Sequence, residues 1–218
     1  GTVAVYDLGG GTFDISILRL SGGIFEVLST NGDTYLGGDD FDNAIVDFWK
    51  GEHNITDQQF SGDASLSQQL RLKAEEAKKH LSANETFSGK INELEVNLTK
   101  EKFNGLINPL LQRTIDSCKR ALADAKLSAK EIDEVIMVGG STRVPLVKET
   151  VGAYFGKKVN DTVNPDEVVG VDISQGMLDM GIQKMEKKGY DNTIKMLLGD
   201  SEKLPFEDAS FDALTVGF

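Results

Sequence analysis

The sequence has little of several features that specialised proteins need. Its 218 residues include one cysteine, Cys118, and two histidines, which excludes an internal disulfide and leaves too few ligands for a Cys/His zinc site. No apolar run approaches the roughly 18 residues of a membrane span, and no charged-then-apolar signal segment opens the chain. Four prolines beside 23 glycines, with 39% hydrophobic residues, exclude collagenous, low-complexity and disordered classes. We therefore expect a folded protein of a reducing cytoplasm, with no membrane partner.

Positive charge is also scarce. Lys and Arg number 23 against 35 Asp and Glu, for a net charge of −12 and a pI of about 4.6. This balance argues against nucleic acid or an anionic membrane as partner. The length allows one large domain or two small ones. A strand pattern begins at the first residue and another runs over 211–218, so we expect both ends to be places where a larger fold was cut.

Hydrophobic periodicity predicts an α/β protein. The first third has alternating apolar residues typical of a strand meander, over 2–7, 12–19 and 24–30. Helical spacing follows over 39–49 and 68–82, with a polar connection over 53–65. Residues 90–98 predict an edge strand or hairpin arm, and 100–125 a long helix in which Pro109 marks a kink or a break.

The remaining residues predict alternating strands and helices. A short helical turn at 128–131 precedes a strand at 134–138, a tight loop at 139–143 and a helix at 144–155. After residue 166, we expect strands over 168–172, 193–198 and 211–216 and a helix over 174–187.

The sharpest local feature is a glycine-rich loop between two predicted strands. Gly9, Gly10, Gly11 and Thr12 stand between Asp7 and Asp14, separated from them by Leu8 and Phe13. One explanation is a hairpin turn that needs glycine for positive φ. The other is a loop that presses backbone N–H groups onto phosphate oxygens, which requires the absence of side chains. Because the two carboxylates would repel phosphate, the second explanation calls for a cation, as in a magnesium-nucleotide.

Two further segments carry polar groups at suggestive spacing. Gly139 and Gly140 with Ser141 and Arg143 lie between a predicted strand and helix, where N–H groups and the helix dipole favour an anion, or where a plain turn suffices. A second set, spaced i, i+3, i+4 and i+7 on one helical face, is either a ligand-binding face or a solvated charged face. This set is Glu75, Lys78, Lys79 and Ser82.

Taken together, these segments resemble a known family. Residues 6–14, 31–42, 75–82, 138–145 and 164–167 resemble, in order and spacing, lobe II of the nucleotide-binding domain of 70-kDa heat-shock chaperones of the DnaK type. The resemblance covers residues 1 to about 169. It implies an actin-like, ribonuclease-H-like α/β lobe with an inserted α+β subdomain over about 38–111.

The resemblance also implies ligands and roles. ATP or ADP with Mg would be the cofactor, and Gly9 to Thr12 would hold the β- and γ-phosphates. Asp7 would act on the water shell of the magnesium, so that Asp7 and Thr12 are what remains of the catalytic residues. The other implied contacts are Glu75, Lys78, Lys79 and Ser82 on the adenosine, Gly139, Gly140, Ser141 and Arg143 on the adenine and α-phosphate side, and Asp166 closing the pocket.

If this resemblance holds, we expect the family's first lobe to be missing, with its phosphate loop, catalytic lysine and magnesium-ordering glutamate. Phosphoryl transfer depends mainly on positioning and charge stabilisation, so we expect adenine-nucleotide binding without efficient hydrolysis, and whether the chain is an enzyme stays open. The partners implied by the parent family are lobe I and a nucleotide-exchange factor.

From residue 170 the chain resembles a different family. Residues 171–178, 198–206 and 211–218 look like a piece of the ubiquinone/menaquinone-biosynthesis C-methyltransferases, which bind S-adenosylmethionine. This implies a partial Rossmann-like βαβ fragment over 170–218. Asp172, at the end of a strand, suits a ribose diol, and Asp200 and Ser201 would meet the adenine. The plainer alternatives are a helix N-cap and a loop carboxylate.

We do not expect a working methyl-donor site. The strand and glycine loop that should precede Asp172 are missing, and Gly140 lies 172 − 140 = 32 positions upstream, against the roughly 20 of a nucleotide fingerprint.

Three hypotheses follow for the whole chain. The first is a chimera whose chaperone lobe binds adenine nucleotide weakly. The second is an S-adenosylmethionine-dependent methyltransferase remnant, and the third is a non-catalytic folding or interaction scaffold. If unpaired, the apolar strands over 193–198 and 211–216 would favour a dimer through the tail.

Overall fold

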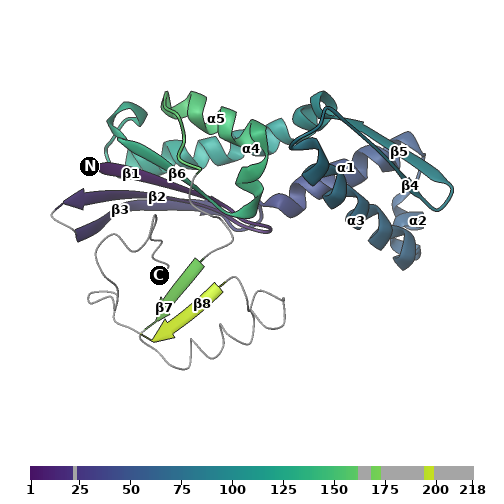
Figure 1. Cartoon of the computed structure of the whole chain (residues 1–218), viewed down its shortest axis with the longest axis horizontal. Helices are drawn as coiled ribbons and strands as arrows, with labels where there is room; N and C mark the ends of the chain where they lie inside the picture. Colours follow the sequence, from purple (N-terminus) through teal and green to yellow (C-terminus); the bar gives the residue numbers. More distant parts are fainter. Residues whose placement is uncertain (22–23, 162–167, 173–193, 199–218) are drawn as a thin grey trace. The chain divides into compact units, whose positions relative to one another are not determined.

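The computed structural model describes residues 1–21, 24–161, 168–172 and 194–198, and it divides into two units, residues 1–160 and 161–218 (Figure 1). The helices and strands of the first unit are β1 (Thr2–Leu8), β2 (Phe13–Ser21), β3 (Ile24–Asp33), α1 (Gly38–Glu52), α2 (Asp57–Gly62), α3 (Ala64–Leu81), β4 (Thr86–Ile91), β5 (Leu94–Thr99), α4 (Lys100–Asp124), β6 (Glu134–Val138) and α5 (Pro145–Phe155). Two 3₁₀ turns, η1 (Ala129–Glu131) and η2 (Gly140–Arg143), flank β6.

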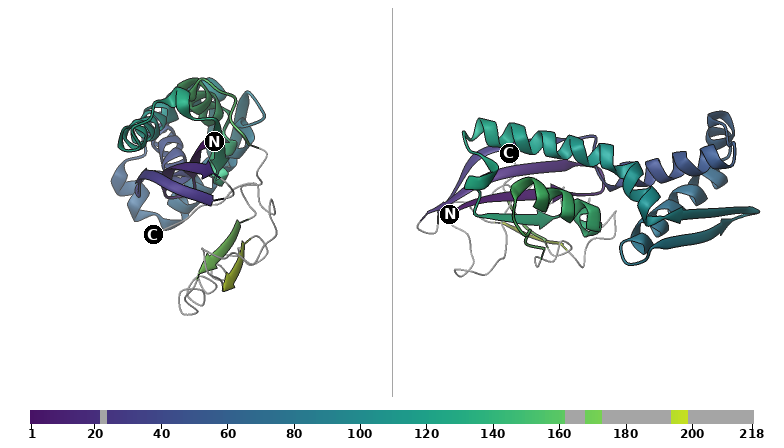
Figure 2. Two further views of the ribbon diagram at one scale, coloured as in Figure 1. Left: turned by 90° about the vertical axis from the view of Figure 1, so that its left-hand side faces the viewer. Right: turned by 90° about the horizontal axis from the view of Figure 1, so that it is seen from above.

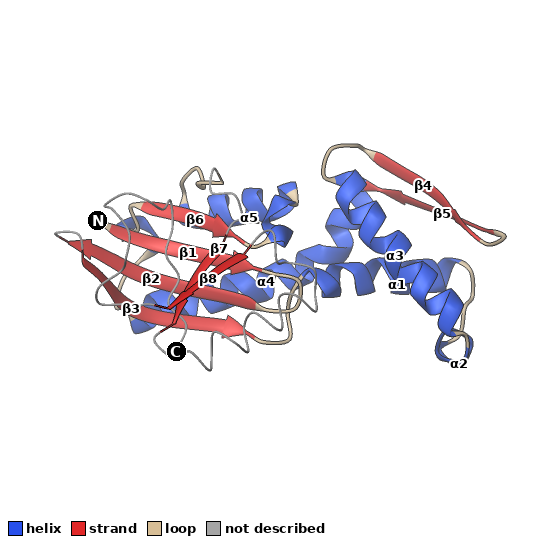
Figure 3. Cartoon of the chain, turned by 60° about the horizontal axis from the view of Figure 1, so that its bottom comes forward, coloured by secondary structure: helices blue, strands red, loops and turns tan. Residues whose placement is uncertain are grey.

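The first unit is built on a four-stranded sheet. The strand order is β3-β2-β1-β6, with antiparallel pairs except for β1 and β6, which run parallel (Figure 3). Alternate residues of β1 and β2, among them Tyr6, Phe13 and Ile15, are fully buried. Helices α4 and α5 pack on one face of this sheet (Figure 1). The three-stranded meander that the apolar alternation predicts is confirmed as β1, β2 and β3.

A second group of elements gathers around the first half of α4. Figure 2 shows α4 running along the sheet and on to α1 and α3, while the β4–β5 hairpin packs against α3. The indole of Trp49 stacks on Phe87, with ring centroids 6.3 Å apart, and its Nε1–H donates to the carbonyl oxygen of Asn97 at 3.0 Å. These contacts bury the apolar faces that the helical spacing of α1 and α3 predicts.

Three local expectations differ from the structure. The polar connection over 53–65 contains α2, which begins at a capping box between Thr56 and Gln59, a signal present in the sequence. Residues 86–99 form both arms of a hairpin, with Asn92 at φ 54° in its turn. Helix α4 continues through the exposed Pro109, so a break at this proline is wrong, while a kink there stays a prediction.

In the second unit the structure describes the strands β7 (Val168–Asp172) and β8 (Ile194–Leu198). They pair in parallel, from Val168 opposite Ile194 to Asp172 opposite Leu198. Both strands are confirmed. The helix predicted over 174–187 and the strand over 211–216 lie outside the described residues, and a Rossmann-like segment is not shown. None of the helices that the structure describes combines the length and the hydrophobicity of a membrane-spanning segment.

Candidate functional site

The glycine-rich loop forms the tight turn between β1 and β2. Gly9 donates its N–H to the carbonyl oxygen of Thr12 at 3.0 Å, and Asp7 pairs with Asp14 across the two strands. None of its three glycines lies at positive φ; among the described residues the glycines that do are Gly139 and Gly156. A side chain at Gly11 would meet no atom within 4 Å, and Gly10, Gly11 and Thr12 are exposed. The glycines therefore leave a bare, accessible backbone. Because none of them needs positive φ, this favours the explanation of a phosphate-binding loop over that of a hairpin turn.

The loop is held in place from two directions through the carbonyl oxygen of Gly9. This oxygen accepts the N–H of Gly38 and the hydroxyl of Ser141, each at 2.9 Å. Beside it, the carbonyl oxygen of Gly10 accepts the N–H of Asp39 at 2.7 Å. The start of α1 and the η2 turn, more than 100 residues apart in the chain, thus converge on the same loop.

Gly37 and Gly38 are site residues that sequence reasoning did not select. A Cβ on Gly37 would lie 2.3 Å from the carbonyl oxygen of Gly10, and one on Gly38 would lie 2.3 Å from Oγ of Ser141. Gly37 has φ −164° and ψ −166°, an extended conformation open to any residue, so close approach is what requires glycine there. The signal was the glycine pair directly before an acidic, apolar-periodic helix.

The second glycine loop lies next to the first because β1 and β6 are parallel neighbours. Asp7 is in register with Val138, and the following Gly139 has φ +88°. A Cβ on Gly139 would lie 2.3 Å from the carbonyl oxygen of Leu8 and 2.7 Å from Oδ1 of Asp7. Gly139 therefore needs to be glycine for two reasons, backbone conformation and contact with the first loop.

The tight loop predicted over 139–143 and the helix predicted over 144–155 are both confirmed. The 3₁₀ turn η2 comes first, held by the Thr142 hydroxyl, which donates to the carbonyl oxygen of Gly139 at 2.6 Å, and α5 begins at Pro145. Gly139 and Gly140 are therefore separated from α5 by a 3₁₀ turn, and an effect of the helix dipole on an anion at this pair stays a prediction. Gly140 and Arg143 are both exposed at the ends of η2.

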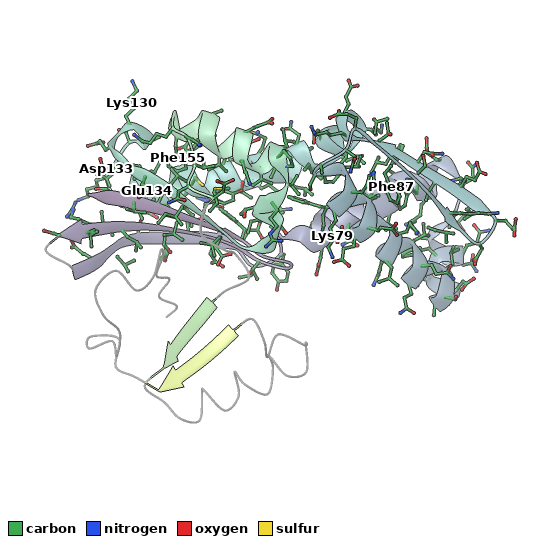
Figure 4. All side chains as sticks on the ribbon, viewed as in Figure 1. Lys79, Phe87, Lys130, Asp133, Glu134 and Phe155 are labelled. Atoms are coloured by element: carbon green, nitrogen blue, oxygen red, sulfur yellow. The ribbon has the colours of Figure 1, made fainter. Side chains whose placement is uncertain are left out.

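The four candidate residues at the C-terminal end of α3 differ in burial: Lys78 and Ser82 are partly buried, whereas the side chains of Glu75 and Lys79 are exposed. Lys78 lies 2.8 Å from Oδ2 of Asp42 and donates to the carbonyl oxygen of Gly38 at 3.2 Å. Ser82 donates its hydroxyl to the carbonyl oxygen of Lys78 at 3.1 Å. Glu75 and Lys79 form an ion pair at 2.7 Å with both side chains well exposed, as expected for a solvated face (Lys79 is labelled in Figure 4). Of the four, Lys78 is the one that contacts the start of α1.

Carboxylates dominate the electrostatics of the site. Burial, and then the facing Asp14, raise the pKa of Asp7, and burial raises the pKa of Asp14. Burial also raises the pKa of Asp42 to about 6, against the lowering effect of Lys78. Two facing carboxylates with raised pKa values are stabilised by a nearby cation, and hard oxygen donors suit Mg²⁺. Among the described residues, no group of three or more His, Cys, Asp or Glu is arranged so that it could hold a metal ion, so such an ion would draw its other ligands from water or a phosphate.

Other candidate residues fall partly or wholly outside the description. Asp166, Asp200 and Ser201 are not among the described residues. Asp172 is the last residue of β7, and only its backbone pairing with Leu198 is described.

Figure 4 labels Asp133 and Glu134 at the start of β6, the end of the sheet opposite the glycine loop; there Asp133 accepts the N–H of Thr2 at 2.6 Å.

Comparison with known proteins identifies a family of molecular chaperones. Residues 1–186 match the family described as Hsp70 protein. The chaperone proteins HscA of Pectobacterium carotovorum and Cronobacter sakazakii are 50% and 49% identical over 171 residues, 78% of this chain. The mitochondrial heat shock 70 kDa protein of Pisum sativum is 45% identical over 200 residues, 85% of this chain. The chain belongs to the Hsp70 family.

The comparisons also bear on the extent of the resemblance. The chain spans 27% to 29% of the length of these relatives. The family match continues past residue 169, where we expected the resemblance to end, and reaches residue 186. These comparisons give no support to a methyltransferase fragment over 170–218, to a chimera, or to S-adenosylmethionine as cofactor.

Proposed function

We propose that this chain is the part of an Hsp70-type chaperone that binds adenine nucleotide, taking ADP or ATP with Mg against the loop from Gly9 to Thr12. The observation that carries the proposal is the convergence of α1 and η2 on the carbonyl oxygen of Gly9, which fixes a loop whose outer side is bare backbone. Fixed, unobstructed N–H groups are what phosphate oxygens need.

The remaining residues would divide the nucleotide between them. Asp7 would hold water on the magnesium ion, which supplies positive charge to the phosphates when bound. Lys78 donates to the carbonyl oxygen of Gly38, next to the glycine-rich loop. Glu75 and Lys79 on α3, and Ser82 directly after it, would contact the adenosine. Ser141 and Arg143, with Gly139 and Gly140, would line the α-phosphate side, and Asp166 would close the pocket.

We expect binding without efficient hydrolysis. Rapid phosphoryl transfer needs charge stabilisation on several sides of the phosphate, and the groups assigned here come from one side. Work on a client protein, and contact with a second lobe or a nucleotide-exchange factor, would belong to the longer chaperone. The cytoplasmic location stays a prediction, since the relatives include a mitochondrial protein.

Calorimetric titration with Mg-ADP and Mg-ATP tests the proposal. Gly11→Ala adds a methyl group where the protein has no atom within 4 Å, so it should leave stability unchanged and weaken Mg-ADP binding by about tenfold, or about 1.4 kcal/mol. Gly105→Ala, on the exposed side of α4 and equally free of neighbours, is the matched control and should bind as the parent does. Absence of binding at millimolar nucleotide, or equal binding by the Gly11→Ala variant, would contradict the proposal and favour a scaffold.

A further inference from the structure

We propose that Asp42 is a positioning residue of this site: its carboxylate holds the Lys78 ammonium group against the support of the phosphate loop. The inference rests on the proposed nucleotide site and adds a residue that sits behind it. Neither the glycine motifs nor the spacing of the α3 residues selects Asp42.

The ammonium group of Lys78 is fixed by two acceptors from α1. It lies 2.8 Å from Oδ2 of Asp42 and 3.2 Å from the carbonyl oxygen of Gly38, and both side chains of the ion pair are largely buried, at 13% and 14% exposure. An ammonium group has three N–H donors. Among the described residues these contacts use two of them, so one donor is left for a ligand.

The ion pair is connected to the phosphate loop through one residue. Gly38, whose carbonyl oxygen accepts from Lys78, donates its own N–H to the carbonyl oxygen of Gly9 at 2.9 Å. Asp42, Lys78, Gly38 and Gly9 therefore form a continuous series of contacts from α1 through α3 to the loop. By contrast, the neighbouring Lys79 pairs with Glu75 on the exposed side of α3.

The surroundings of Asp42 are unfavourable for a charged carboxylate. Its Oδ1 is buried and has no hydrogen-bond donor among the described residues. Two more carboxylates face it, Glu75 from α3 and Asp39 from α1, and both add to the rise in its pKa that burial causes, while Lys78 opposes it. A buried ion pair in such surroundings is weak evidence for stability, so placement of Lys78 is the better explanation.

A double-mutant cycle on Mg-ADP binding tests whether Asp42 acts through Lys78. Asp42→Asn and Lys78→Gln should each weaken binding by about tenfold, and the double variant should bind no more weakly than Lys78→Gln alone. Asp47→Asn is the matched control, because Asp47 lies on the same helix and pairs with Lys50 instead; it should bind within about twofold of the parent. Losses that add in the double variant would overturn the inference. Since the double variant removes both buried charges, it remains informative if Asp42→Asn leaves too little folded protein.

A measurement without nucleotide separates this inference from the proposed function. Labelling with an amine-reactive reagent, read by mass spectrometry, should be slow at Lys78 in the parent and about tenfold faster in Asp42→Asn, with the exposed Lys130 as internal reference. Unchanged labelling of Lys78 would overturn the positioning role. If Asp42→Asn accelerates the labelling of Lys78 but the parent chain binds no nucleotide, the proposed function is overturned, while the contact between Asp42 and Lys78 is established.

Discussion

Replacing Gly37 by alanine is the sharpest perturbation of the site, because the three atoms nearest to the added methyl group all belong to the backbone. Its Cβ would lie 2.3 Å from the carbonyl oxygen of Gly10, 2.5 Å from the carbonyl carbon of Gly10 and 2.6 Å from the nitrogen of Gly11. Carbon contacts normally lie at about 3.5–4.0 Å, so the glycine-rich loop and the start of α1 must separate by about 1 Å. The extended backbone of Gly37 costs alanine nothing, so the effect is steric.

The magnitude follows from what the separation breaks. Forcing a methyl group into a packed position costs about 1–3 kcal/mol. The hydrogen bonds from Gly38 to Gly9 and from Asp39 to Gly10 cross the same interface and must lengthen. We therefore expect Gly37→Ala to lower the free energy of unfolding by about 2 kcal/mol and to weaken Mg-ADP binding by about tenfold to a hundredfold.

Urea unfolding and calorimetric titration measure the two effects. Gly11→Ala is the comparison, since it places the same methyl group on the glycine-rich loop itself without a contact and should change affinity alone. If Gly37→Ala unfolds within about 0.5 kcal/mol of the parent and binds equally well, α1 does not pack on the loop as described, and the reasoning fails.

Three further predictions concern other parts of the chain. Gly105→Ala, in the second turn of α4 with open space around its Cβ, should raise the free energy of unfolding in urea by about 0.5–1 kcal/mol, and a loss of stability would contradict the helical backbone described there. Burial raises the pKa of the Cys118 thiol to about 12, so at pH 8 a thiol reagent should modify the native protein no faster than it unfolds, whereas prompt labelling would show that the thiol is accessible. Because the pKa of Asp42 is raised to about 6 in the folded state, protonation favours that state; the parent should gain on the order of 2 kcal/mol relative to Asp42→Asn as the pH falls from 7.5 to about 4, and a constant difference in urea unfolding would refute this.

Local sequence patterns were sufficient to predict much of the four-stranded sheet and most of the helices. The alternation in residues 2–7 and 12–19 predicts β1 and β2, because side chains on a strand point alternately to the two faces of the sheet. The capping box of Thr56 and Gln59 was also visible in the sequence, but the prediction of a polar connection over 53–65 did not take it into account. Signals of this kind act between residues a few positions apart, so they survive in the sequence alone.

The site depended on contacts that no local pattern contains. Gly37 looks like one more loop glycine, and its necessity comes from the backbone of Gly10, 27 positions earlier in the chain. Asp42 looks like an exposed carboxylate of a helix, and its role comes from Lys78, 36 positions later. The motifs identified the glycine loop and the family resemblance, because the bare backbone and the spacing are written in order along the chain. Which residues support that loop was settled by packing, since close approach and burial depend on how distant segments meet in three dimensions.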